Sequence, residues 1–409
     1  MTATPPLPAP LAGKVAALCL IAAAQVLALS VWFAGAAALP ALVAASEIGP
    51  LKQAGLTSSV QLGFVIGAVA SAVLGLADRI TPQRLFAAGA ITAALANLVA
   101  LALEPGSLAM IASRAVAGAA LALVYPVGMK LAASWARGDA GLLVGLLVGA
   151  LTLGSALPFA FNLADTVPDW RLPFAASALA ALIAAGLILF ARGGPGLRPA
   201  APFDPAAALL AVRDPALRLT NLGYLGHMWE LYAMWAWIGP FSHAYWLSRG
   251  GSARLGDLTA FAVVASGAIA CLAAGRLADR LGRTRITMIA LAISGGCALL
   301  AGPGFTLTPW ILIPLLIIWG MAVIADSAQF SAAITELAPP ERTGTLLTLQ
   351  TAMGFALTVI MVQALGVWID RVGWTWAFTP LAIGPAIGIW AMARLRARPE
   401  AARLAGGRG

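Results

Sequence analysis

Four ionisable side chains stand within long apolar stretches of the chain: Arg114, His227, Glu230 and Asp326. Such groups are costly to place in an apolar medium, and they commonly mark the path of a solute or a proton. Tyr224, His227 and Glu230 are three residues apart in "YLGHMWELYAMWAW", so on a helix they share one face. A carboxylate, an imidazole and a phenol there could bind a proton and a polar solute. The alternative is a His227–Glu230 pair that only satisfies itself against a neighbouring helix.

The remaining candidates lie on other parts of these stretches. Gln329 follows Asp326 by one helical turn, and together they could line the same cavity from another side. An internal salt bridge is the alternative for Asp326. Arg114 shares its stretch with Tyr125 and could attract an anionic substrate, or it could pair within the protein. His243 stands near the end of its apolar stretch and is expected at the membrane interface.

Membrane-spanning helices must position these residues. The chain is 61% hydrophobic and 10% charged, whereas soluble proteins carry about 25% charged residues. About 20 apolar residues cross a bilayer as a helix, and lipid requires backbone polar groups to be satisfied within the segment. Twelve such runs are predicted, at 15–42, 56–77, 83–103, 107–134, 140–163, 172–192, 217–247, 256–277, 285–304, 308–335, 343–369 and 374–393. The predicted fold is therefore an all-α, multi-pass integral membrane protein.

The distribution of basic residues predicts the orientation. With the N-terminus inside, nineteen Lys and Arg fall on the inner side, five on the outer side, and Arg114 lies within a span. An excess of Lys and Arg on the cytoplasmic side is the positive-inside rule. Both termini are therefore expected in the cytoplasm, with the chain in the cytoplasmic membrane. The net charge of +9 is thus explained by topology, and a nucleic-acid partner is not expected.

This orientation can be tested by labelling. Cysteines placed at Lys52 and Arg249 are expected to react with a membrane-impermeant thiol reagent from outside, and a cysteine at Arg198 is not. The measurement is labelling of intact cells before and after permeabilisation. Labelling at Arg198 in intact cells would contradict the twelve-span topology.

The chain repeats itself once. Asp78 and Arg79 stand 201 residues before Asp279 and Arg280, and other short matches have similar offsets. A six-span unit occurring twice in parallel is characteristic of transporters whose halves rock about a central site. The predicted divisions are a first bundle at 1–192, a cytoplasmic linker at 193–214, a second bundle at 215–395 and a cytoplasmic tail at 396–409. Within the linker, "DPAAALLAVRD" could form a short helix.

At this point the chain resembles the major facilitator superfamily over nearly all of its length. The stretch "GRLADRLGRTR" is similar to the signature loop of that family, which is degenerate in the first half, "LGLADRITPQR". "RAVAG" and "ELAPPERTGT" resemble two further family motifs. The loop residues are Asp78 and Arg79 in the first half, and Gly275, Asp279, Arg280, Gly282 and Arg283 in the second.

The resemblance implies a secondary active transporter that moves a small solute by alternating access. It implies proton coupling, no cofactor, and function as a monomer in the lipid bilayer. The two loop carboxylates could latch the cytoplasmic face by pairing with arginines or with a helix N-terminus. A basic loop that only anchors the topology is the alternative.

The fifth span carries the clues to subfamily. Gly141, Gly145 and Gly149 form a tandem small-residue face suited to close helix packing. "TLGSALPF" lacks the Gly-Pro and Gly-Gly typical of drug antiporters and looks more like the nitrate/nitrite and cyanate-type porters. With Arg114, this favours a small anion. Metabolite or drug efflux and a non-transporting receptor are the alternatives.

An integral-membrane enzyme is the rival class, and the motifs do not favour it. The sequence holds two histidines and three isolated cysteines, too few and too scattered for a zinc site. It also holds no P-loop for ATP. No metal and no cofactor are therefore expected.

Overall fold

The computed structural model describes residues 11–137, 139–164, 169–197, 204 and 207–409, and all regular structure in these residues is helical. The first half contains α1 (Leu11–Leu29), α2 (Ala34–Ala45), α3 (Pro50–Leu74), α4 (Leu76–Arg79), α5 (Pro82–Leu101), α6 (Leu108–Leu121), α7 (Tyr125–Ala133), α8 (Ala140–Phe161) and α9 (Arg171–Leu189). The second half contains α10 (Ala207–Arg213), α11 (Pro215–Leu247), α12 (Ala253–Leu281), α13 (Arg283–Ala301), α14 (Pro309–Ala325), α15 (Ser327–Leu337), α16 (Thr343–Val372) and α17 (Ile383–Arg396). Short 3-10 turns, including Asn162–Ala164 and Pro399–Gly406, complete the described chain.

The helices form twelve membrane spans. In the described residues, eleven helical stretches are long and apolar enough to cross a bilayer. α11 is the twelfth span, because its 33 residues are long enough to cross the bilayer. Its hydropathy is lower because it carries His227, Glu230 and several aromatic residues. The predicted fold class, twelve spans in two six-helix bundles, is confirmed.

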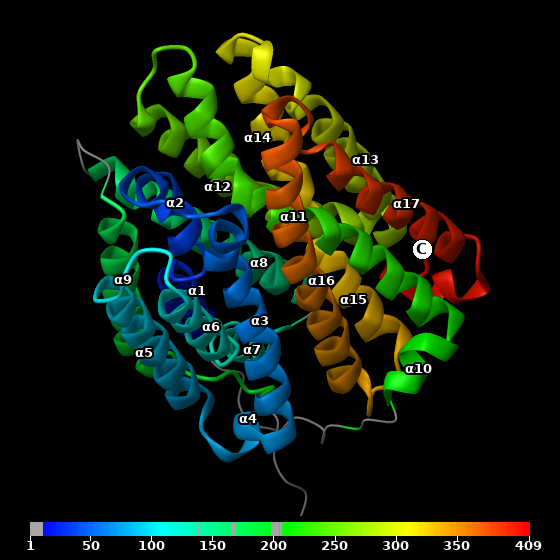
Figure 1. The fold of residues 1–409 in the computed structure, drawn as a ribbon. Helices are drawn as coiled ribbons and strands as arrows, with labels where there is room; N and C mark the ends of the chain where they lie inside the picture. Colours follow the sequence, from blue (N-terminus) through cyan, green and yellow to red (C-terminus); the bar gives the residue numbers. More distant parts are fainter. Residues whose placement is uncertain (1–10, 138, 165–168, 198–203, 205–206) are drawn as a thin grey trace, which may run out of the picture.

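The two bundles lie side by side (Figure 1). In the first bundle α3 packs against α6 and α5 against α9; in the second, α11 packs against α17 and α12 against α14. The most extensive contacts between the bundles are those of α8 with α12 and of α3 with α16. The predicted helix in the linker is present as α10. The exact domain boundaries stay a prediction.

Small residues allow α8 and α12 to approach closely. A Cβ atom at Gly145 would lie 3.1 Å from the carbonyl oxygen of Cys271, and one at Gly149 would lie 3.3 Å from that of Ala268. In the contact between these two helices, Thr152 Oγ1 of α8 lies 3.9 Å from Cys271 Sγ of α12. The tandem glycine face of the fifth span therefore forms part of the junction between the two halves.

Three spans are broken near their middle. The first span leaves helical geometry at residues 30–33, between α1 and α2, and the fourth does so at residues 122–124, between α6 and α7. The tenth breaks at Asp326, between α14 and α15. In transporters, broken helices expose backbone groups only where protein or a cavity can satisfy them, so these breaks mark the functional interior.

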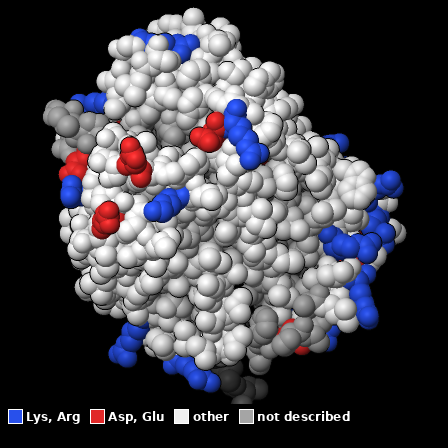
Figure 2. All heavy atoms as spheres, in the orientation of Figure 1, with Lys and Arg blue, Asp and Glu red and all other residues white. Residues whose placement is uncertain are grey.

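Charged side chains gather toward two ends of the molecule, with a broad uncharged band between them (Figure 2). Such a band is what a bilayer core requires. We call the end that holds the loop at 275–285 the inner end and the end that holds Lys52 and Arg249 the outer end, following the predicted orientation.

Candidate transport site

The centre of the site is a buried pair between α11 and the break in the tenth span. His227 Nδ1 lies 2.8 Å from Asp326 Oδ1, and both side chains are 1% exposed. Asp326 is placed there by the break itself, because it ends α14 and precedes α15. Asp326 Oδ2 and His227 Nε2 have no hydrogen-bond partner among the described residues. Both atoms could therefore bind a proton or a hydrogen-bonding ligand within the protein interior.

Glu230 points to a different neighbour from the one that the helical spacing suggested. Its Oε1 accepts a hydrogen bond of 2.6 Å from Trp319 Nε1 of α14, and its side chain is buried. No hydrogen bond or ion pair joins Glu230 to His227 in the described structure. Glu230 and Asp326 nevertheless lie within electrostatic range of one another. The structure thus brings three titratable groups together in the second bundle.

Aromatic side chains surround this cluster. The Tyr224 ring centroid lies 6.1 Å from that of His227, and Phe330 of α15 lies 5.8 Å from His227. Nearer the junction of the bundles, Trp32 of the first span contacts Tyr232 and also Phe355 of α16, at centroid distances of 5.7 and 5.3 Å. These rings fill the middle of the molecule between the two halves.

Arg114 lies apart from this cluster, inside the first bundle. Its Nη1 donates to Asn97 Oδ1, and its Nη2 donates to the carbonyl oxygens of Val31 and Trp32 at 2.6 and 3.3 Å. The guanidinium also lies 5.4 Å from the Phe174 ring centroid. Arg114 therefore satisfies the backbone that the break in the first span leaves open. This geometry fits the pairing alternative for Arg114, and it leaves only Nε unpartnered.

Tyr125 begins α7, directly after the break in the fourth span. It is part-buried and within electrostatic range of Tyr224 and Tyr232 of α11. Tyr125 therefore faces the second bundle, which the sequence alone could not place.

Gln329 belongs to the inner end and not to the Asp326 site. Its Oε1 accepts a hydrogen bond of 2.9 Å from Arg283 Nη1. Arg283 also forms a two-point ion pair with Glu336, at 2.8 and 2.6 Å, and lies 3.5 Å from Asp279 Oδ1. The signature arginine thus ties α15 to the loop between α12 and α13.

The loop also contacts the first bundle. A Cβ atom at Gly141, in the first turn of α8, would lie 2.9 Å from Asp279 Oδ2, and one at Gly275 would lie 3.3 Å from the carbonyl oxygen of Gly141. A carboxylate near the first turn of a helix is favourable because of the helix dipole. Gly282 adopts a φ of +97°, and a Cβ there would meet the carbonyl oxygens of residues 408 and 409 at 2.4 Å. Arg280 is exposed.

The first-half copy of the loop is simpler. Gly75 adopts a left-handed φ of +60°, and Lys130 Nζ of α7 donates to the carbonyl oxygen of Ala77 at 3.2 Å. Arg79 is exposed, and the Asp78 side chain lies outside the described part of the structure.

Lys14 ties α1 to the start of α8 at the same inner end. Its Nζ lies 2.6 Å from Asp139 Oδ2. The backbone N–H of Arg137 and the Lys14 ammonium hold the pKa of Asp139 below its usual range. Asp139 therefore keeps its charge, and this tie, over the ordinary range of pH.

The inner contacts lead to a prediction for Asp279. Asp279→Asn removes the carboxylate charge from the N-terminus of α8, a contribution of about 1 kcal/mol, or about fivefold in an equilibrium. We expect the maximal transport rate to change by about that factor with little change in substrate affinity, because the pocket is untouched. The measurement is initial-rate flux against substrate concentration.

Arg276→Gln is the matched control, since Arg276 is exposed in the same loop and should behave as wild type. If Asp279→Asn has wild-type flux at normal expression, the loop is only a topology anchor.

Sequence reasoning missed two pairings. The His227–Asp326 pair joins residues 99 positions apart, and the only signal in the sequence was that each is an ionisable residue in an apolar run. His243, expected near the outer end of its span, is buried within the protein: its Nε2 lies 3.2 Å from Asp257 Oδ1. Asn162 donates to the same Asp257 oxygen at 2.9 Å and to the carbonyl oxygen of Ala37 at 3.0 Å. The partner on α12 shields the imidazole from solvent at this end of the span.

Two bundles of six spans, joined around buried titratable groups and broken helices, define a secondary transporter. The sequence model of the Major Facilitator Superfamily matches residues 21–362 and 258–409. The chain therefore belongs to the Major Facilitator Superfamily, and it is a transporter and not an enzyme.

Solved structures share its fold. A proton:xylose symporter, XylE, bound to 6-bromo-6-deoxy-D-glucose matches with a TM-score of 0.69 and 14% identity over 93% of this chain and 95% of that chain. A D-xylose-proton symporter matches with a TM-score of 0.70 and 14% identity, over 96% of this chain and 98% of that chain. The nucleoside transporter NupG matches with a TM-score of 0.71 and 14% identity, over 94% of this chain and 99% of that chain. No curated protein matches the sequence. At this identity the likeness concerns the fold.

Proposed function

We propose that this transporter couples the movement of a small polar solute to protons, and that His227, Asp326 and Glu230 hold the coupling proton. The observation that carries the proposal is the buried His227–Asp326 pair with unpartnered atoms at the break of the tenth span. When Glu230 loses a proton, the net charge of the three groups becomes more negative by one. Proton binding thus changes the charge of a buried cluster, which is the requirement for coupling.

α15 offers a mechanical route from this cluster to the inner end. It begins directly after Asp326, and its Phe330 lies against His227. On the same helix, Gln329 and Glu336 bind Arg283 of the loop. A change in the charge of Asp326 would bias the position of α15 and thereby the contacts of the loop with α8. Coupling through such a two-state element is the physical basis of alternating access.

The solute class is supported less directly. The fold neighbours are named for xylose and for nucleosides, two different solutes, so the fold does not select one. The anion preference rested on the fifth-span resemblance together with Arg114, and the Nη atoms of Arg114 are held by Asn97 of α5 and by the carbonyl oxygen of Val31 in the first span. We therefore favour a small polar solute without net negative charge. Kinship with nitrate/nitrite or cyanate porters rests only on the fifth-span resemblance.

Other parts of the proposal follow from the sequence. We place the protein in the cytoplasmic membrane with both termini in the cytoplasm, working as a monomer. The alternative is efflux of a metabolite or drug in exchange for protons, in which the same cluster would carry the proton. Import and efflux are distinguished by which direction of the pH gradient drives accumulation in the assay.

The test is transport by purified protein. A screen for solutes that raise the thermal stability of the protein supplies the substrate, because a ligand that binds the folded state stabilises it. Flux of that solute in proteoliposomes is then measured with and without a pH gradient. We expect accumulation only with the gradient. Flux that ignores the gradient would refute proton coupling, and binding without any flux would indicate a receptor.

A further inference from the structure

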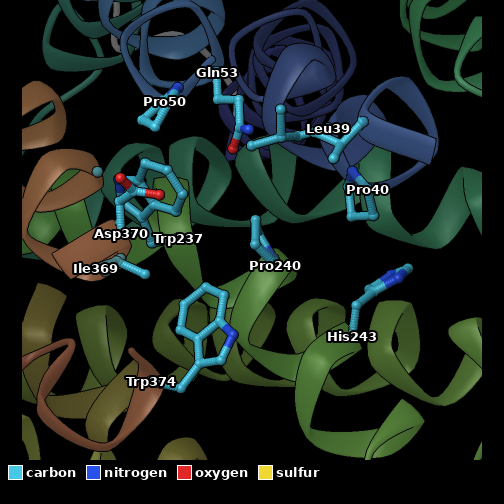
Figure 3. A pocket seen from close by; sticks show the side chains of 12 residues that line it. Leu39, Pro40, Pro50, Gln53, Trp237, Pro240, His243, Ile369, Asp370 and Trp374 are labelled. Carbon is cyan, nitrogen blue, oxygen red and sulfur yellow. The ribbon is translucent and has the colours of Figure 1, made fainter. Parts of the chain in front are cut away.

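A cavity lies at the outer end, between the two bundles (Figure 3). The cavity has a volume of ≈ 240 Å³. Pro50 and Gln53 of α3 border it from the first bundle, and Trp237 of α11, Asp370 of α16 and Trp374 border it from the second. None of the transport-site candidates lines it. It is therefore a separate place, in which a ligand would touch both halves.

Most of the polar groups on its wall already have partners. Trp237 Nε1 donates to a carbonyl oxygen of α16 at 3.1 Å, and Gln53 Nε2 donates to that of Ile48 at 2.6 Å. His243, which Figure 3 shows across the cavity from Trp237, has its Nε2 3.2 Å from Asp257 Oδ1. A ligand with many hydroxyl groups would leave several of them without partners, which is costly.

Asp370 is the exception. Its exposed carboxylate makes no hydrogen bond or ion pair with the described residues, and it lines the cavity together with Trp237 and Trp374 (Figure 3). It also stands in the last turn of α16, where the helix dipole adds negative potential. Arg371 follows Asp370 in the same last turn and Lys52 precedes Gln53, but neither lines the cavity. The wall of the cavity therefore combines one carboxylate with apolar and aromatic side chains.

We propose that this cavity is a binding site for a small organic cation, such as an alkylated ammonium group. The cation would rest against the indole rings of Trp237 and Trp374 and face the Asp370 carboxylate. Aromatic faces attract such cations, and proline and isoleucine side chains accommodate their methyl groups. A ligand with one positive charge and an apolar surface uses every feature of this wall.

Occupancy of this site has a conformational consequence. Because the ligand contacts both bundles, it binds this arrangement of the halves in preference to one in which they separate at the outer end. This inference is independent of proton coupling, because binding is measured on solubilised protein without any gradient.

The test compares choline with its uncharged analogue 3,3-dimethyl-1-butanol, in thermal unfolding of purified protein at constant ionic strength. We expect choline to raise the melting temperature in a concentration-dependent way and the analogue to have no effect. Asp370→Asn should weaken choline binding by about tenfold or more, since it removes a charge-assisted contact. Asp169→Asn is the matched control, because Asp169 is an exposed carboxylate paired with Arg171 outside the cavity.

The outcomes are distinct. Equal stabilisation by the alcohol, or an unchanged choline affinity in Asp370→Asn, would overturn the cation site. Asp370→Glu guards against misfolding, since it retains the charge and should retain binding. If choline stabilises wild type and Asp370→Glu but not Asp370→Asn, the assignment stands whether or not transport proves to depend on a pH gradient.

Discussion

Asp326→Asn is expected to abolish proton-driven accumulation of the solute. A pH difference of one unit supplies about 1.4 kcal/mol per proton, so one-to-one coupling gives about tenfold accumulation. Asparagine keeps the volume of the side chain and an oxygen toward His227 but cannot exchange a proton. We therefore expect the accumulation ratio to fall to about one, while exchange of labelled for unlabelled solute continues. The measurement is uptake in proteoliposomes at equal and unequal pH.

The chain contains a matched control for this experiment. His243 and Asp257 form a second buried histidine–aspartate pair, at the outer end and away from the tenth-span break. Asp257→Asn should keep the wild-type response to the pH gradient. If Asp326→Asn accumulates solute as well as wild type, the pair with His227 is only structural.

Glu230→Gln is expected to have a similarly large effect on accumulation, and it tests Glu230 separately from the His227–Asp326 pair. The glutamine side-chain oxygen can still accept the hydrogen bond from Trp319 Nε1, so the packing of α11 against α14 is preserved. Only the titration is removed. We expect loss of accumulation under a pH gradient with exchange retained, measured in the same assay as above.

Trp319→Phe provides the comparison, because it removes the donor and keeps the carboxylate. This variant should still respond to the pH gradient. Wild-type accumulation by Glu230→Gln would show that Glu230 serves only as the acceptor for Trp319, and would confine the coupling proton to the His227–Asp326 pair.

The fold was predictable because its signals are local. Runs of apolar residues set the spans, and the paired "LADR" loops set the two-bundle repeat. The helix α10 was also foreseen, since "AALLAVR" is a favourable helical sequence beside a proline-rich segment.

The contacts of the site were harder to predict because they depend on helix breaks. Asp326, at the break, pairs with His227, whereas Gln329, only three positions later, binds Arg283. Residues three apart on a helix are neighbours, so the sequence pattern alone could not separate their partners. Likewise, the partners of Arg114 include carbonyl groups freed by the break in the first span, which nothing in its own stretch reveals.

The glycine-lined contact of α8 with α12 also offers an experimental handle. Thr152 of α8 faces the native thiol of Cys271 across the junction of the two halves. A cysteine introduced at Thr152 would bring two thiols together there, and a short bifunctional reagent could then cross-link the bundles. Protein trapped in this way would be uniform in conformation, which suits antibody selection and imaging by electron microscopy.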